Sequence, residues 1–182
     1  MTDKSSVPCS LASVTPASGR QTPDATWDFT ARDERDTEAL GAALGKSLAH
    51  GGLVALVGTL GAGKTRLVQS IAVALGADRR LVSSPTFVLI QEYEAALPIF
   101  HCDTYRLRNV AEFLDLGVDE ILQSDGVCLI EWADRVAEIL PPDHLRIDID
   151  VTGPTARHFR LQAGGPKSAL LLASARTAIE PE

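Results

Sequence analysis

Short apolar runs and amphipathic stretches alternate along most of the 182-residue chain. Residues 53–57 are wholly apolar, which is typical of a parallel strand buried on both faces. Leu40, Leu44 and Leu48 instead recur at the spacing of one helix face. Asp36 precedes them and is predicted to cap that helix. The patterns predict strands over residues 27–32, 53–57, 87–93, 97–103, 127–132, 144–151 and 157–162. They predict helices over residues 36–50, 66–75, 111–117, 119–123, 133–140 and 167–177. This alternation indicates an α/β protein.

The first 24 residues differ in composition from the rest. They are rich in Ser, Thr, Pro and Ala and show no apolar period. Such a segment buries too little apolar surface to offset the entropy lost on folding, so residues 1–24 are predicted to be a disordered tail. One domain is expected over residues 25–182, a length sufficient for a single core.

Composition narrows the class of protein. The net charge is −7, from 17 basic and 24 acidic side chains, which disfavours broad binding to nucleic acids or membranes. No apolar stretch reaches the roughly 20 residues of a membrane helix, and no secretory signal is evident. The cysteines, Cys9, Cys102 and Cys128, are far apart and odd in number, which disfavours a disulfide framework. A cytoplasmic protein that does not associate with membranes is expected.

A glycine-rich motif stands between the apolar strand and the next helix. Residues 58–65 match the pattern G-x-x-x-x-G-K-[ST] of a phosphate-binding loop, or Walker A motif. In such a loop backbone N–H groups cradle phosphate oxygens, and the following helix adds its positive N-terminal end. Lys64 is expected to reach the β- and γ-phosphates, and the Thr65 hydroxyl to bind Mg²⁺. The predicted nucleotide-binding residues here are Gly58, Thr59, Leu60, Gly61, Ala62, Gly63, Lys64, Thr65 and Arg66.

Two acidic residues stand at the ends of predicted buried strands. Mg²⁺ usually takes one or two carboxylates. We predict Glu131 as the metal-side carboxylate, and Asp103 as either a second one or the group that orients the attacking water. Thr86 follows the phosphate-loop helix, and it either contacts Mg²⁺ or the γ-phosphate or belongs to a plain turn. The predicted catalytic residues are Lys64, Thr86, Asp103 and Glu131.

His101 and Trp132 stand close to these carboxylates in the sequence. In a strand His101 faces the same side as Asp103, so it either helps to hold Asp103 or a water or is a structural histidine. Trp132 either stacks on an adenine or a partner or, as is commoner, packs in the core. No Cys/His spacing typical of zinc occurs, so no zinc site is expected.

Four motifs follow one another in a specific order. They are the phosphate loop, SPTF at 84–87, HCDTYRL at 101–107 and LIEWADR at 129–135. In this order and spacing the chain resembles the TsaE family, also called YjeE, the small ATPases of bacterial tRNA threonylcarbamoyladenosine synthesis. The resemblance spans about residues 36–160.

The resemblance implies a three-layer P-loop NTPase fold with a mixed, largely parallel central sheet, which binds ATP or ADP with Mg²⁺. It assigns Thr65 and Glu131 to the metal and Asp103 to the support of hydrolysis. Thr37 corresponds to a family threonine that contacts the nucleotide, and Arg157 to a basic position near the nucleotide.

The resemblance also implies partners. Family members associate with the TsaB–TsaD pair, which transfers threonylcarbamoyl to an adenosine of tRNA. Contact with tRNA is expected only indirectly, through these partners. Because no arginine finger is evident at a recognisable place in the sequence, we expect an ATPase that is slow alone and whose site is completed by partner binding. Two alternatives stay open: a small-molecule P-loop kinase, and a nucleotide-dependent binding module with negligible catalysis. A GTP switch is disfavoured because no N-K-x-D motif for reading guanine occurs.

Overall fold

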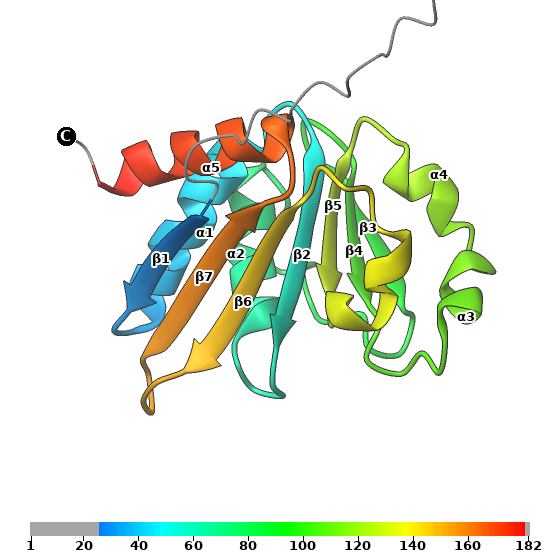
Figure 1. Ribbon diagram of the computed structural model, residues 1–182, viewed down its shortest axis with the longest axis horizontal. Helices are drawn as coiled ribbons and strands as arrows, with labels where there is room; N and C mark the ends of the chain where they lie inside the picture. The colour runs from blue at the N-terminus through cyan, green and yellow to red at the C-terminus, as the bar shows by residue number, and fades with distance from the viewer. Residues whose placement is uncertain (1–25, 181–182) are drawn as a thin grey trace, which may run out of the picture.

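A seven-stranded mixed sheet forms the centre of the molecule (Figure 1). The computed structural model describes residues 26–180, so the tail predicted over residues 1–24 lies outside the described residues. The strands are β1 (Thr26–Ala31), β2 (Gly52–Gly58), β3 (Ile90–Tyr93), β4 (Ile99–Asp103), β5 (Val127–Glu131), β6 (Leu145–Val151) and β7 (Arg157–Ala163). Their order in the sheet is β1-β7-β6-β2-β5-β4-β3. The neighbours β6, β2, β5 and β4 pair in parallel, whereas β7 and β3 run antiparallel to their neighbours.

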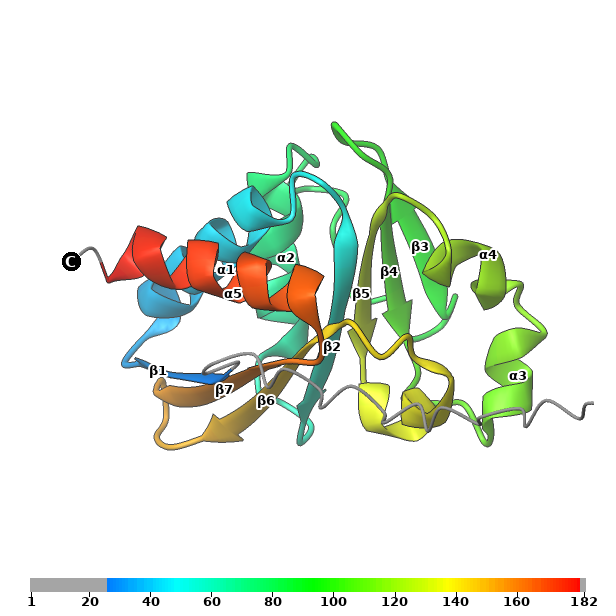
Figure 2. The ribbon, with the colours of Figure 1, turned by 45° about the horizontal axis from the view of Figure 1, so that its top comes forward.

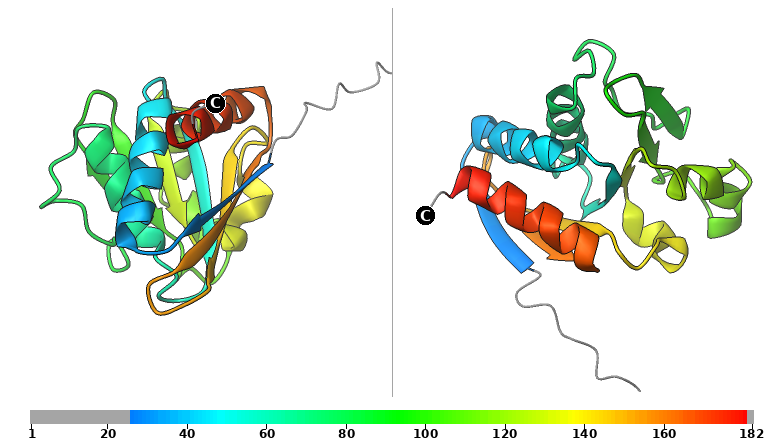
Figure 3. Two further views of the ribbon diagram at one scale, coloured as in Figure 1. Left: turned by 90° about the vertical axis from the view of Figure 1, so that its left-hand side faces the viewer. Right: turned by 90° about the horizontal axis from the view of Figure 1, so that it is seen from above.

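Helices cover both faces of the sheet, which confirms the predicted α/β class and the three layers. They are α1 (Glu34–Ser47), α2 (Lys64–Ala74), α3 (Val110–Leu114), α4 (Val118–Leu122), α5 (Pro166–Ile179) and a 3₁₀ helix, η1 (Ala133–Ile139). Helices α1, α2 and α5 pack on one face, with α1 and α5 side by side (Figures 2 and 3). Helices α3, α4 and η1 pack on the other. Among the described residues no helix combines the length and apolarity needed to cross a membrane.

The apolar run of β2 is explained by its two buried faces. Val54 and Leu56 belong to the core beneath α1, α2 and α5. Leu53 and Ala55 alternate with them and belong to the core beneath α3, α4 and η1. A central strand needs apolar side chains at every position because successive residues point to opposite faces. This burial fixes the carboxyl end of β2, from which the glycine-rich loop begins.

Helix α1 begins earlier than predicted. Asp33, not Asp36, is its N-cap, because the Asp33 carboxylate accepts hydrogen bonds from the backbone N–H groups of Arg35 and Asp36. Asp36 lies in the first turn, where its carboxylate accepts from the Arg32 backbone and side chain. This contact with Arg32 lowers the pKa of Asp36. Two aspartates three residues apart thus share the helix start, and the sequence alone did not separate their roles.

Alanine at Asp33 is expected to cost about 1 kcal/mol of stability, because two N–H groups of α1 lose their acceptor. For a domain of this size that corresponds to a fall of about 2–4 °C in the thermal midpoint, measurable by circular dichroism. Asp36→Ala is the matched control, since Asp36 mainly pairs with an exposed arginine. A fall at Asp36 as large as that at Asp33 would contradict this assignment of the cap.

Two further elements differ from the sequence prediction. Strand β3 begins at Ile90 rather than at residue 87, because the Pro85 carbonyl accepts from the N–H groups of Val88 and Leu89 and closes a turn. Leu89 has a φ of 67°, which no strand residue adopts. The predicted helix over 133–140 is the 3₁₀ helix η1, preceded by Trp132 with a φ of 59°. Both segments border the carboxyl ends of β4 and β5, where Leu89 accepts from the Asp103 N–H and Trp132 follows Glu131.

Candidate functional site

The glycine-rich loop joins β2 to α2 at the carboxyl end of the parallel strands (Figure 1). This is the predicted strand–loop–helix arrangement. Gly61 and Gly63 have φ angles of 78° and 105°, which side-chain-bearing residues rarely adopt. Gly63 is the N-cap of α2, so the loop leads directly to the positive end of that helix. The backbone of residues 58–65 therefore has the form that binds phosphate groups.

Lys64 lies folded against its own loop. Its Nζ donates hydrogen bonds to the carbonyl oxygens of Gly58, at 2.7 Å, and of Thr59, at 3.0 Å. The ammonium also lies 3.7 Å from the centre of the Trp132 ring, a cation–π contact. Burial lowers the pKa of Lys64, although Glu131 and Asp103 partly oppose this. Trp132 is half-buried and lies at the site, so core packing is not its role.

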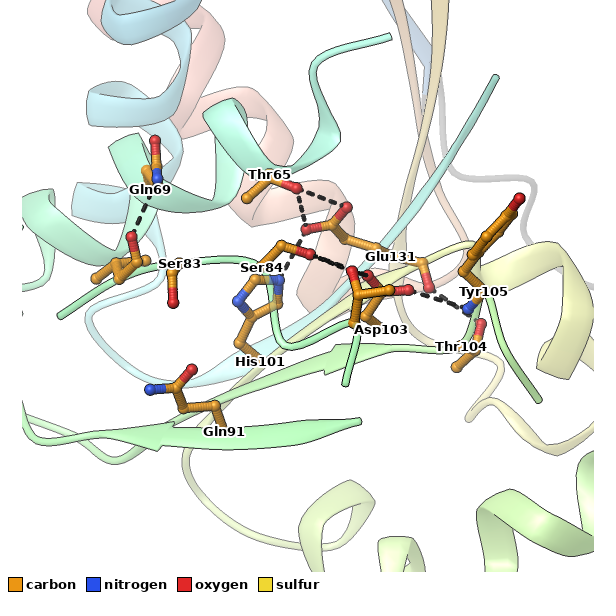
Figure 4. A network of polar contacts seen from close by, with 12 residues as sticks. Thr65, Gln69, Ser83, Ser84, Gln91, His101, Asp103, Thr104, Tyr105 and Glu131 are labelled. Carbon is orange, nitrogen blue, oxygen red and sulfur yellow. Dashed lines mark hydrogen bonds and ion pairs between the residues drawn. The ribbon is translucent and has the colours of Figure 1, made fainter. Parts of the chain in front are cut away.

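Glu131 and Asp103 lie next to each other at the ends of β5 and β4. The parallel register pairs the two residues directly, and each is 3% exposed. The Thr65 hydroxyl donates to Glu131, with its oxygen 2.8 Å from Oε1 and 3.0 Å from Oε2 (Figure 4). The predicted metal-side pair, Thr65 and Glu131, is therefore in contact. Hydroxyl and carboxylate oxygens are the hard donors that Mg²⁺ prefers, so this donor set fits that ion.

Asp103 anchors the loop that precedes β3. Its Oδ2 accepts from the Thr86 hydroxyl at 2.7 Å and from the Ser84 hydroxyl at 3.1 Å. Its Oδ1 accepts from the Tyr105 backbone N–H at 3.0 Å (Figure 4). The Thr86 hydroxyl is therefore fixed beside a buried carboxylate, which a plain turn would not require. Ser84 joins Thr86 in holding Asp103, a role that the sequence did not indicate.

His101 contacts Glu131 and not Asp103. Its Nε2 lies 2.9 Å from Glu131 Oε1, and its Nδ1 lies 3.1 Å from the Tyr93 hydroxyl oxygen. The ring is fully buried. Of the roles left open for His101, the structure has a hydrogen-bonded histidine that contacts its diagonal neighbour on β5 and does not hold Asp103. Tyr93 was not singled out from the sequence, and its only signal was an aromatic residue at the end of a strand.

One cavity of about 310 Å³ brings the predicted catalytic residues together. Its lining residues are Leu60, Gly61, Gly63, Lys64, Thr65, Ser84, Thr86, Asp103, Tyr105, Glu131 and Trp132. A cavity of about 290 Å³ lies apart from the loop, between α1 and α5, and no carboxylate lines it. The glycine-rich loop, a lysine and two carboxylates meet only in the first of these two cavities, so it is the candidate site.

The remaining predicted residues lie on the other side of the loop. Arg157 Nε donates to the Ala62 carbonyl at 2.9 Å and so holds the loop from β7. Thr37, Arg66 and Arg157 line a further, smaller cavity of about 110 Å³. Arg66 pairs there with Glu34, at 2.6 Å. The structure therefore brings these three residues to the phosphate loop from α1, α2 and β7, although they are far apart in sequence.

The sequence of this chain matches one family of known proteins. The family model described as "Threonylcarbamoyl adenosine biosynthesis protein TsaE" matches residues 31–159. A Bacillus subtilis relative, named tRNA threonylcarbamoyladenosine biosynthesis protein TsaE, is 42% identical over 122 residues, which are 66% of this chain and 75% of the relative. A Treponema pallidum relative of the same name is 40% identical over 120 residues, which are 66% of this chain and 88% of the relative.

A solved structure shows the same fold. The crystal structure of Bacillus subtilis YdiB aligns with a TM-score of 0.72 at 32% identity, covering 85% of this chain and 97% of that one. This likeness supports the expected P-loop NTPase fold with its mixed sheet. The chain belongs to the TsaE family of tRNA threonylcarbamoyladenosine biosynthesis.

Proposed function

We propose that this protein is the Mg²⁺-dependent ATPase of the machinery that makes tRNA threonylcarbamoyladenosine, and that it acts with the TsaB–TsaD complex. One observation carries the proposal: a phosphate loop, its lysine, a Thr65–Glu131 pair and a loop-held Asp103 line a single cavity. Membership of the TsaE family supplies the pathway. The partners follow from the resemblance and the cytoplasmic location from the composition of the chain, and both belong to the proposal.

Each group of residues in the cavity has a different role in ATP hydrolysis. The loop backbone binds the phosphates of ATP, and Lys64 places a positive charge at the β- and γ-phosphate oxygens. Thr65 and Glu131 hold Mg²⁺, which neutralises phosphate charge when bound. Asp103 accepts a hydrogen bond from the attacking water and so directs it, while Ser84 and Thr86 fix the orientation of its carboxylate. Tight binding of ADP in the same cavity is also expected.

The cavity favours water over a small-molecule acceptor. Of the described residues that line it, Lys64 alone is basic. A kinase of small molecules needs further cations to hold the acceptor and close over the phosphates. A partner that supplies such a group would complete the site, and this explains why we expect slow hydrolysis by the protein alone.

The test is ATP hydrolysis by the purified protein, measured with and without reconstituted TsaB–TsaD. We expect slow turnover alone and stimulation by at least about tenfold with the partners, because one added cation at the phosphates is worth this much or more. Lys64→Ala with the partners serves as the control for contaminating ATPases, because this variant should lose nearly all of the turnover that belongs to the protein. Tight ADP binding without any stimulated hydrolysis would instead favour a nucleotide-dependent binding module, and phosphoryl transfer to an acceptor would favour a kinase.

A further inference from the structure

A buried chain of hydrogen bonds leads away from the metal-side carboxylate. It runs from Glu131 to His101, from His101 to Tyr93, and from Tyr93 to the carbonyl of Ser83. We propose that His101 and Tyr93 are positioning residues, which fix the Glu131 carboxylate for the metal and couple it to the loop over residues 83–86. The proposal rests on the proposed function, since it concerns the residues that support the Mg²⁺ ligand.

The direction of each hydrogen bond follows from its partners. An ionised Glu131 can only accept, so the hydrogen between it and His101 sits on Nε2. In a neutral ring Nδ1 then has no hydrogen and needs a donor, and the Tyr93 hydroxyl lies 3.1 Å from it. Tyr93 thereby selects the tautomer that directs an N–H at Glu131. Such outer partners set the orientation of metal ligands.

Tyr93 has further acceptors besides His101, which are the Ser83 carbonyl and, more distantly at 3.4 Å, the Gln91 side-chain oxygen. Its hydroxyl oxygen lies 3.0 Å from the Ser83 carbonyl, about as close as to His101. A phenol has one hydrogen, so donation to one acceptor leaves the other without it. Burial raises the pKa of Tyr93, which keeps that hydrogen in place. The direction in which the Tyr93 hydroxyl points therefore links the orientation of the Glu131 carboxylate, through His101, to the hydrogen bond that holds the Ser83 carbonyl.

Because these side chains are buried, water cannot easily replace the hydrogen bonds between them. Tyr93 is 4% exposed and His101 is fully buried, so water has little access to replace a lost bond there. The loop that begins at Ser83 continues to Ser84 and Thr86, which hold Asp103. The two carboxylates of the cavity are thus connected through Tyr93 and this loop as well as through the register of their strands.

Tyr93→Phe tests the proposal, because it removes one oxygen and keeps the ring. We expect ADP affinity in the presence of Mg²⁺, measured by calorimetry, to fall by about tenfold, while the affinity without Mg²⁺ stays the same. Hydrogen exchange of the ligand-free protein provides a readout without metal or nucleotide, and there the amides of residues 83–89 should exchange faster. Ser168→Ala is the control, a hydroxyl also 4% exposed that donates to Asp143 at the start of α5, near the amino ends of β2 and β5 and away from the cavity.

His101 variants locate the effect within the chain of hydrogen bonds. The side-chain N–H of glutamine falls near Nε2, so His101→Gln should keep most of the Mg²⁺ effect, whereas His101→Asn should lose it. Adding Tyr93→Phe to His101→Asn should cost little more, because the link is already broken.

An equal loss of ADP affinity with and without Mg²⁺ in Tyr93→Phe, or no loss at all, would overturn the positioning role, and so would a full additive loss in the double variant. If wild-type protein showed no effect of Mg²⁺ on ADP affinity, the proposed function would fail. Unchanged exchange of residues 83–89 in Tyr93→Phe would separately refute the coupling to the loop.

Discussion

Replacing Lys64 by alanine should reduce ATP turnover by about 10²–10³-fold, because it removes the charged donor that faces the phosphate oxygens in the transition state. The lysine is well placed for that role. It is the one basic residue among the described lining of the cavity, and its Nζ already lies between the loop carbonyls and the Trp132 ring. Steady-state hydrolysis with TsaB–TsaD present is the measurement.

Two comparisons separate this effect from a loss of folding. Lys46→Ala removes a lysine from the last turn of α1, away from the cavity, and should leave turnover unchanged. The thermal midpoint of Lys64→Ala should stay near that of the wild type, since the freed carbonyls of Gly58 and Thr59 can be hydrated at the partly exposed loop. Wild-type turnover in a folded Lys64→Ala protein would show that the assigned role is wrong.

The two carboxylates should respond to neutralisation in different ways. Glu131→Gln removes the charge beside Thr65, so we expect the Mg²⁺ concentration for half-maximal hydrolysis to rise by at least about tenfold. Asp103→Asn leaves that pair intact, and we expect it to lower kcat by about 10²-fold with little change in the Mg²⁺ requirement. Magnesium titrations of hydrolysis in both variants, under the same partner concentrations, measure the difference.

This pair of variants also resolves the two roles that the sequence leaves open for Asp103. A second metal-side carboxylate would raise the Mg²⁺ requirement as Glu131→Gln does. The structure favours direction of water, because three protein donors already contact the Asp103 carboxylate from Ser84, Thr86 and Tyr105. A matching shift in both variants would assign Asp103 to the metal instead.

The phosphate loop was predictable because consecutive residues determine it. A wholly apolar strand, fixed glycine positions and an amphipathic helix are local features, and the structure has all three in the expected places. The positions of Glu131 and Asp103 at strand ends were predictable for the same reason. Their direct pairing was not, since it depends on β4 lying beside β5 in one particular register.

The contacts of His101 could not be predicted from the alternation of side chains along one strand. Along β4 it shares a side with Asp103, but its hydrogen-bond partners come from β5 and β3. Tyr93 reaches it because β3 pairs antiparallel with β4, an arrangement that no periodicity indicates. The turn at residues 85–89 likewise depends on a distant group, because Thr86 bonds to Asp103 and the strand begins only afterwards. Tertiary contacts outweighed the local preference for a strand there.

The pairing of β1 with β7 has a consequence for synthesis of the protein. The first strand of the described fold completes the sheet only by joining the strand that precedes the last helix. Pairings between such distant segments close large loops and are slow to form. On the ribosome β1 must therefore wait, with apolar side chains such as Trp27 exposed, until β7 has emerged. Chaperone demand during translation should consequently concentrate on this N-terminal segment rather than on the phosphate loop.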